Sequence, residues 1–136
     1  MLRRTFINKF SISLPIASLF PFNSFSKNTF NLNYAPHLGM FKNTVGDDPI
    51  DQINYMADLG FRAFEDNGMS SRSVDLQNKI SKTLENRGMK MGVFVAHKIY
   101  WDKPNLSSGD DEYKNEFLNY IKNSVEVAKR VNAKWM

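Results

Sequence analysis

Cysteine is absent from this chain of 136 residues. Its absence excludes disulfide bonds and thiolate metal sites, and it gives no support for a cysteine-linked lipid anchor. The sequence also lacks a GxGxxG or GxxxxGK phosphate loop, a Ser-His-Asp order, an HExxH motif and a zinc-ligand spacing. With 42% hydrophobic and 24% charged residues, the composition is that of a folded globular protein, and the length suits one domain.

Long hydrophobic runs are missing too. The longest apolar segment, SISLPIASLFPF at residues 11–22, has only about a dozen residues, too few for a comfortable membrane span. It follows the basic segment MLRRTFINKF, and this order is typical of a signal peptide. We therefore predict that residues 1–26 are an export signal. A non-cleaved amphipathic or disordered N-terminus is the alternative.

The basic part of this segment carries a recognisable pattern. Arg3 and Arg4, followed by Thr-Phe-Ile, resemble the twin-arginine export motif, which implies contact with the export machinery and a periplasmic location. Removing residues 1–26 takes away Arg3, Arg4 and Lys9 and no acid, so the net charge falls from +4 to +1. The basic charge is mostly accounted for by the signal, and we expect no nucleic-acid partner.

After the signal, strand patterns alternate with helix patterns. We expect strands in FNLNYAPH (30–37), GFRAFEDN (60–67) and MKMGVFVAH (89–97), the last an apolar run of the kind buried on both faces of a sheet. Helices are expected at 49–59, at 73–87 and from about Asp111, with Asp48 as an N-cap and Gly60 and Gly88 as stops. The last residues, AKWM, suggest the start of a fourth strand.

This alternation predicts an α/β fold with a parallel sheet. We interpret residues 27–136 as the first three to four βα units of a (β/α)8 TIM barrel, truncated, because units of roughly 30 residues suit that fold. An open doubly wound sheet is the alternative, and the missing phosphate loop weighs against it.

Polar residues end each expected strand. His37 ends the first, Glu65, Asp66 and Asn67 end the second, and His97 ends the third. Since sites in such folds lie at the carboxyl ends of the strands, these side chains form a candidate site. Each histidine taken alone also suits a loop or core position, and Asp66 and Asn67 suit a turn.

Two further details bear on this site. Glu65 shares its strand parity with Phe61 and Ala63, so it is expected to face inward. Trp101 follows the third strand and suits either stacking on a sugar ring or covering the rim of the barrel.

The segments FNLNYAPHLGMF, GFRAFEDNGM and NRGMKMGVFVAH resemble the first three strands of the xylose isomerase-like TIM barrel superfamily. The closer likeness is to its hydroxypyruvate isomerase and sugar phosphate isomerase/epimerase branch, which includes exported bacterial members. This resemblance implies a metal-dependent isomerase or epimerase of a small sugar or hydroxy-carbonyl substrate. A divalent metal, Mg or Mn, would polarise the carbonyl group while carboxylates move a proton through an enediol.

The resemblance also limits which functional residues can be assigned to this chain. In that family the metal ligands and catalytic glutamates come mainly from the second half of the barrel, so no catalytic or metal-binding residue is assigned here. Only His37, Glu65 and His97 carry over, together with Trp101 as a candidate, in substrate binding. We expect the chain to be the front of a protein of about 250 residues or more.

As an isolated chain it is then expected to be inactive and to aggregate, stay molten or self-associate as a homo-oligomer. A non-catalytic carbohydrate-binding or scaffold protein on the same fold is the alternative function. A DNA-repair endonuclease ranks last, because the mature part is nearly neutral and carries an export signal.

Overall fold

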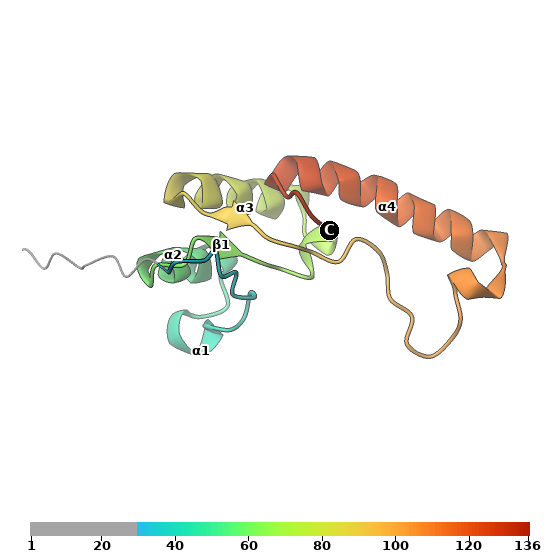
Figure 1. The fold of residues 1–136 in the computed structure, drawn as a ribbon, viewed down its shortest axis with the longest axis horizontal. Coiled ribbons are helices and arrows are strands. Elements are labelled where there is room, and N and C mark those ends of the chain that lie inside the picture. Colours follow the sequence, from blue (N-terminus) through green and yellow to red (C-terminus); the bar gives the residue numbers. More distant parts are fainter. Residues whose placement is uncertain (1–29) are drawn as a thin grey trace, which may run out of the picture.

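The computed structural model describes residues 30–136 (Figure 1). The predicted export signal, with Arg3 and Arg4, lies outside the described residues. The elements along the chain are α1 (Lys42–Val45), α2 (Pro49–Asp58), β1 (Ala63–Phe64), the 3-10 turn η1 (Met69–Ser71), α3 (Val74–Arg87), β2 (Lys90–Met91), the 3-10 turn η2 (Leu106–Ser108) and α4 (Asp111–Val131). The fold is α/β, as predicted, with mostly helical regular structure and a small parallel sheet. Among residues 30–136, no helix is long and apolar enough to cross a membrane.

The three longer helices begin within one residue of their predicted starts, and α2 and α3 end within one residue of their predicted ends. The Asp48 carboxylate accepts a hydrogen bond from the Ile50 amide at 2.7 Å, and Pro49 takes the first helical position of α2. Asp110 caps α4 in the same way, at 2.8 Å from the Glu112 amide. Gly88 ends α3 with a φ of 63°, a left-handed conformation that glycine adopts at little cost.

The strands are parallel but much shorter than the predicted ranges 30–37, 60–67 and 89–97. Ala63 pairs with Lys90 and Phe64 with Met91, and a single parallel bridge joins His37 to Glu65. Three segments therefore lie side by side in chain order. The prediction that the third segment is buried on both faces is wrong, because Val93 is 45% exposed. Within the described residues, helices cover only one face of the sheet, so the other side of this run stays open.

The expected fourth strand is not formed. Asn132 ends α4 with a φ of 53°, and the Ala133 amide donates to the Ala128 carbonyl at 2.9 Å. The residues after it are not in a strand, and Trp135 is 74% exposed. A strand needs a neighbour along its length, and these four residues pair with none of the described segments.

The core lies between the sheet, helices α2 and α3, and the C-terminal end of α4, and most of α4 extends away from the strands (Figure 1). Its fully buried centre includes Phe64 from β1, Ile53 and Met56 from α2, and Ile80 from α3. Burial along the apolar side of α4 is uneven. Val131 is buried, whereas four others are half-buried: Tyr113, Phe117, Ile121 and Ala128.

Ser124 and Val127 are the other buried residues of α4. Ser124 is polar, and its hydroxyl donates to the Ala96 carbonyl at 2.6 Å, which fastens α4 to the extended segment after β2.

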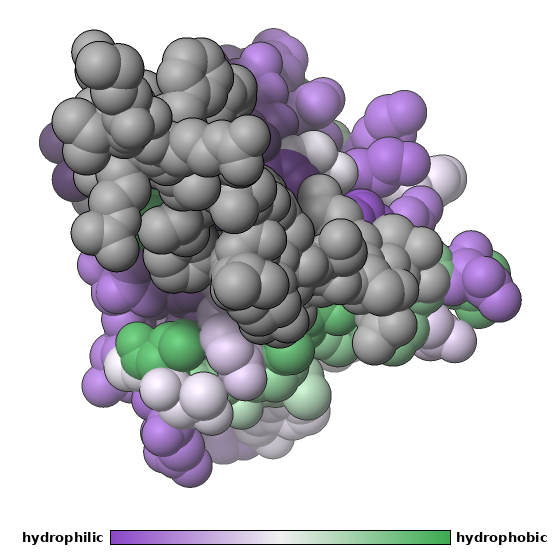
Figure 2. All heavy atoms as spheres, turned by 90° about the vertical axis from the view of Figure 1, so that its left-hand side faces the viewer, coloured by the Kyte–Doolittle hydropathy of each residue, from purple (hydrophilic) through white to green (hydrophobic). Residues whose placement is uncertain are grey.

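On the face that Figure 2 shows, hydrophobic atoms of the described residues gather along the lower side, and hydrophilic atoms lie next to them.

Candidate functional site

The carboxyl ends of the three parallel segments lie next to one another. His37 is bridged to Glu65, and the Val95 amide donates to the Asn67 carbonyl at 3.4 Å. The first segment therefore meets the second at its polar end, and the second meets the third two residues before His97. The three strand ends that the sequence singles out form one rim.

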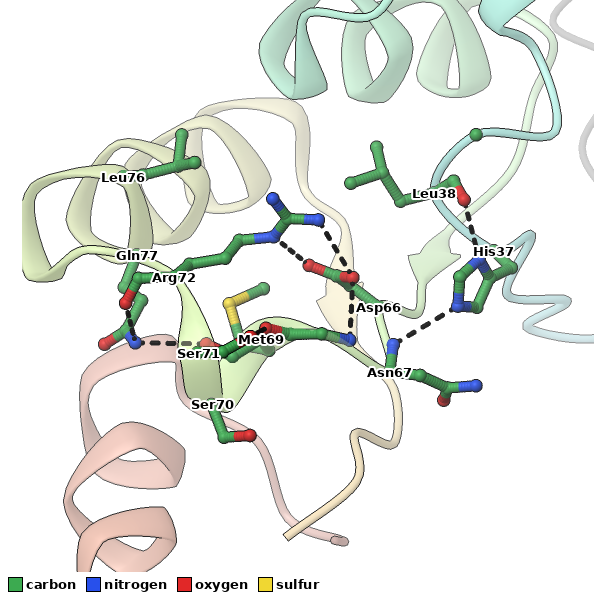
Figure 3. Close-up of polar contacts among 12 residues, drawn as sticks. His37, Leu38, Asp66, Asn67, Met69, Ser70, Ser71, Arg72, Leu76 and Gln77 are labelled. Carbon is green, nitrogen blue, oxygen red and sulfur yellow. Dashed lines mark hydrogen bonds and ion pairs between the residues drawn. The ribbon is translucent and has the colours of Figure 1, made fainter. Parts of the chain in front are cut away.

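The His37 side chain connects the first two strand ends of this rim. Its Nε2 accepts a hydrogen bond from the Asn67 amide at 3.2 Å, and its Nδ1 lies 2.6 Å from the Leu38 carbonyl (Figure 3). Since Nε2 is the acceptor, the proton of the neutral ring is on Nδ1, where it is donated to that carbonyl. Both ring nitrogens are used by the backbone, so His37 joins the first two strand ends and has no nitrogen left for a substrate.

Asp66 is the buried acid of the rim, with only 2% exposure. Its carboxylate forms an ion pair with Arg72, in which Arg72 Nη2 donates to Oδ1 at 3.1 Å, and it also accepts from the Gly68 amide at 3.1 Å (Figure 3). The predicted turn role of Asp66 is confirmed by the Gly68 contact. The ion pair adds a second role, because it fixes the loop that carries Asn67 against the start of α3.

A buried glutamine extends this network toward α4. Gln77 Nε2 donates to the carbonyls of Met69 and Arg72, at 3.0 and 2.9 Å, and its Oε1 accepts from Arg130. Every buried polar side-chain atom in the described residues has a partner. The network connects the loop after β1 to α3 and α4.

Glu65 is half-buried beside two small residues. A Cβ atom placed on Gly92 would lie 3.4 Å from the Glu65 Cβ and 3.5 Å from the Ala35 Cβ, so Gly92, Ala35 and Glu65 share one side of the sheet. Glu65 and Ala35 are half-buried there, whereas Ala63, which shares the strand parity of Glu65, is buried. No side chain among residues 30–136 pairs with the Glu65 carboxylate, which is thus the available acid of the rim.

His97 stands at the third strand end. Its Nδ1 lies 2.9 Å from the Lys98 carbonyl, and its ring meets Phe117 of α4 edge to face, with ring centroids 5.0 Å apart. Nε2 has no partner among residues 30–136. Trp101 is 89% exposed in the loop beyond, so the described structure does not bring it into the rim.

A cluster that sequence reasoning missed lies beside His97. The Tyr100 hydroxyl lies 2.8 Å from both carboxylate oxygens of Glu116, and Lys98 and Lys103 sit over its ring at 4.5 and 5.0 Å from the centroid. The hydrogen bond to Glu116 raises the pKa of Tyr100, because the carboxylate stabilises the protonated phenol. The contact between Tyr100 and Glu116 could not be predicted from a local sequence pattern, because the loop and the first turn of α4 separate the two residues.

The described residues contain no group of three histidine, aspartate or glutamate side chains that could hold a metal ion. The rim therefore does not by itself provide the oxygen-rich ligand set that Mg or Mn requires. Comparison of the chain with protein-family profiles, curated proteins and solved structures gave no match.

Proposed function

We propose that the chain is the front part of a TIM barrel, and that it contributes substrate-binding residues to an exported metal-dependent isomerase or epimerase of a small sugar or hydroxypyruvate. One observation carries this proposal. Three parallel segments lie in chain order, joined by helices, and their polar ends meet at one edge. This arrangement supports the proposal, because a barrel of this kind is built from such units and has its active site at the carboxyl ends of the strands.

The rim residues then have different tasks. Glu65, with its free carboxylate, accepts hydrogen bonds from substrate hydroxyl groups, and His97 offers Nε2 to the same ligand. His37 and Asp66 hold the loops in place. The divalent metal, Mg or Mn, would supply carbonyl polarisation in the complete protein, and because the described residues do not gather its ligands, we assign none to this chain.

The binding role is tested with the full 136-residue chain and ligand-observed NMR. We expect weak saturable binding of hydroxypyruvate or of a small ketose, without interconversion. Glu65→Gln should weaken the binding about tenfold, because a hydrogen bond to a charged group contributes about 1.5–3 kcal/mol. Glu112→Gln, which removes an exposed carboxylate from the first turn of α4, should leave it unchanged.

Equal binding by the Glu65→Gln variant, or no binding of any hydroxy-carbonyl compound, would contradict the role of the rim. Reading the gene beyond the codon for Met136 tests the other half of the proposal. We expect the frame to continue with acidic and histidine residues at further strand ends.

A non-catalytic carbohydrate-binding protein is the second candidate. It is favoured by the exposed Trp101, whose flat side chain suits stacking on a sugar ring, and by a rim without a ligand set of its own. Trp101→Ala separates the two candidates. If the chain is a carbohydrate-binding protein, Trp101→Ala should lose affinity for sugars. If it is the front part of an isomerase, Trp101→Ala should keep its affinity and Glu65→Gln should lose it.

A further inference from the structure

The loop after β1 contains the one Asn-Gly pair of the chain, Asn67 and Gly68. Such a pair is where an asparagine most readily loses its side-chain amide, because glycine has no Cβ atom to crowd the reaction. Asn67 is exposed, and Figure 3 shows its side chain pointing away from Asp66 and Arg72. The reacting side chain is therefore open to water.

The main chain of Asn67 is the point where the three parallel segments meet. Its amide donates to His37 Nε2 at 3.2 Å, which joins it to the first segment. Its carbonyl accepts from the Val95 amide at 3.4 Å, which joins it to the third. A change in the main chain at this residue therefore affects the contacts on both sides.

Loss of the amide begins when the Gly68 main-chain nitrogen attacks the side-chain carbonyl carbon of Asn67, Cγ. A bond from this nitrogen to Cγ forms and the bond from Cγ to the side-chain nitrogen breaks. Ammonia leaves, taking up the proton of the Gly68 amide. Water then opens the succinimide ring at either of its carbonyl groups. Opening on one side gives aspartate, and opening on the other gives isoaspartate, whose main chain is longer by a carbon atom.

The loop restrains this attack through the attacking nitrogen itself. The Gly68 amide donates to Asp66 Oδ1 at 3.1 Å, and the Asp66 side chain is only 2% exposed. Arg72 forms an ion pair with the same carboxylate and holds it in place. The hydrogen bond must break before the nitrogen can form a bond to Cγ, so the reaction requires a local opening of the loop.

We propose that Asn67 is a site of spontaneous deamidation whose rate is set by the ion pair between Asp66 and Arg72. The reaction is slow while the loop is closed and proceeds when it opens. Its product carries a new carboxylate in the loop that follows Glu65. The longer main chain of isoaspartate also disrupts the contacts with His37 and Val95, so the three strand ends lose their common joint as the protein ages. This inference goes beyond the sugar-binding role and does not depend on it.

The test follows the full 136-residue chain at mildly alkaline pH, where the amide nitrogen loses its proton more readily. Peptide mapping by mass spectrometry measures aspartate and isoaspartate at position 67 over time. We expect the folded chain to react at least about tenfold more slowly than the same chain in guanidinium chloride, because unfolding removes the hydrogen bond to the charged carboxylate.

Matched variants assign the restraint to the ion pair. Arg72→Gln removes the partner of Asp66 and should raise the rate in the folded chain about tenfold. Arg87→Gln makes the same change where α3 pairs with Asp58 of α2, away from the loop, and should leave the rate unchanged.

Gly68→Ala should suppress the reaction, because its Cβ atom crowds the attack. The loop accommodates this change. The added Cβ atom would lie 3.4 Å from Asp66 Oδ1, an ordinary contact, and the φ of Gly68 is negative, as alanine prefers. This variant therefore separates the chemistry at Asn67 from the stability of the fold.

Amide hydrogen exchange measures the effect on the rim. After ageing, the Val95 amide should exchange faster in the wild-type chain, because its acceptor at residue 67 has moved. In the equally aged Gly68→Ala chain its exchange should be unchanged.

Several outcomes would overturn the proposal. Equal rates with and without denaturant, or a slower reaction in Arg72→Gln, would show that the Asp66 carboxylate does not restrain the attack. Equal acceleration by Arg72→Gln and Arg87→Gln would mean that global stability alone sets the rate. If Arg72→Gln does not fold, the comparison of the folded and denatured wild-type chains still decides. Unchanged Val95 exchange in a chain that contains isoaspartate would contradict the loss of the joint.

Discussion

Two neighbouring acids in the loop after β1 have opposite environments. The Asp66 carboxylate is enclosed and paired with Arg72, whereas Glu65 is half-buried beside Gly92 and has no side-chain partner among residues 30–136. Successive residues of a strand point to opposite faces, so this separation follows from the strand geometry alone. One acid stabilises the loop, and the other remains available to a ligand.

Removing the buried acid should destabilise the protein. Asp66→Asn leaves Arg72 with a charge that is 25% exposed and has no carboxylate, and loss of one partner of a buried pair costs about 3 kcal/mol. Urea denaturation at low protein concentration measures the change. Asp58→Asn breaks the exposed pair with Arg87 and should cost less than about 0.5 kcal/mol. Equal effects of the two substitutions would contradict this account.

The Tyr100 hydroxyl should titrate at higher pH than an ordinary phenol. Its pKa is raised in the folded protein, first by the hydrogen bond to Glu116, so folding favours the protonated form. The stabilisation is therefore fully present below the ordinary pKa of 10.0 and is lost as the pH rises through the higher folded value. Glu116→Gln should lower the pKa in a spectrophotometric tyrosinate titration, whereas Glu112→Gln should leave it unchanged. An unchanged titration in the Glu116 variant would mean that this hydrogen bond is not formed in solution.

At the scale of elements, the sequence predicts the helices far better than the strands. The ends of α2, α3 and α4 depend on neighbouring residues, such as Asp48 with Ile50 or Gly88 in its left-handed conformation. The length of a strand depends on partners that are distant in the chain. The alternation of apolar and polar residues predicts where β1 and β2 lie, but it does not show that Val93 is exposed.

The same limit applies to the site. His37, Glu65 and His97 were found because polar residues end apolar runs, and the adjacency of the first two is confirmed. The pairing of Asp66 with Arg72 was missed, because it forms across the turn η1 and follows no periodicity. The role of Glu65 in substrate binding stays a prediction.

Gly92 sets the distance between β1 and the extended segment after β2. A Cβ atom at this position would lie 3.0 Å from the Phe64 carbonyl oxygen, closer than nine in ten such contacts, and the backbone there cannot move aside easily. Gly92→Ala should therefore destabilise the protein by about 1–3 kcal/mol, the usual cost of overpacking. The measurement is again urea denaturation, with Val93→Thr at the exposed neighbouring position as the control, which should cost less than about 1 kcal/mol. A neutral Gly92→Ala would show that the two segments separate without penalty.

At the scale of the whole molecule, the described chain covers one side of its sheet and leaves the other side open. Helices α2, α3 and α4 share a core with β1 and β2, while several large apolar side chains are more than half exposed: Leu32, Tyr34, Met40, Trp101 and Trp135. Exposed strand edges and apolar surface promote association between chains. Such a surface suits a unit that is completed by further structure.

The isolated chain should therefore self-associate. In sedimentation velocity the average sedimentation coefficient should rise with protein concentration, and a dye that fluoresces on apolar surface should bind. Leu32→Ser with Met40→Ser should reduce this association, because the two side chains are 64% and 68% exposed and contribute little to the core. Lys114→Gln with Lys122→Gln, which changes exposed charge on α4 and leaves the apolar surface intact, should not reduce it. A monomer with one sharp cooperative unfolding transition would show that the open side is stable in water and that the chain needs no completing partner.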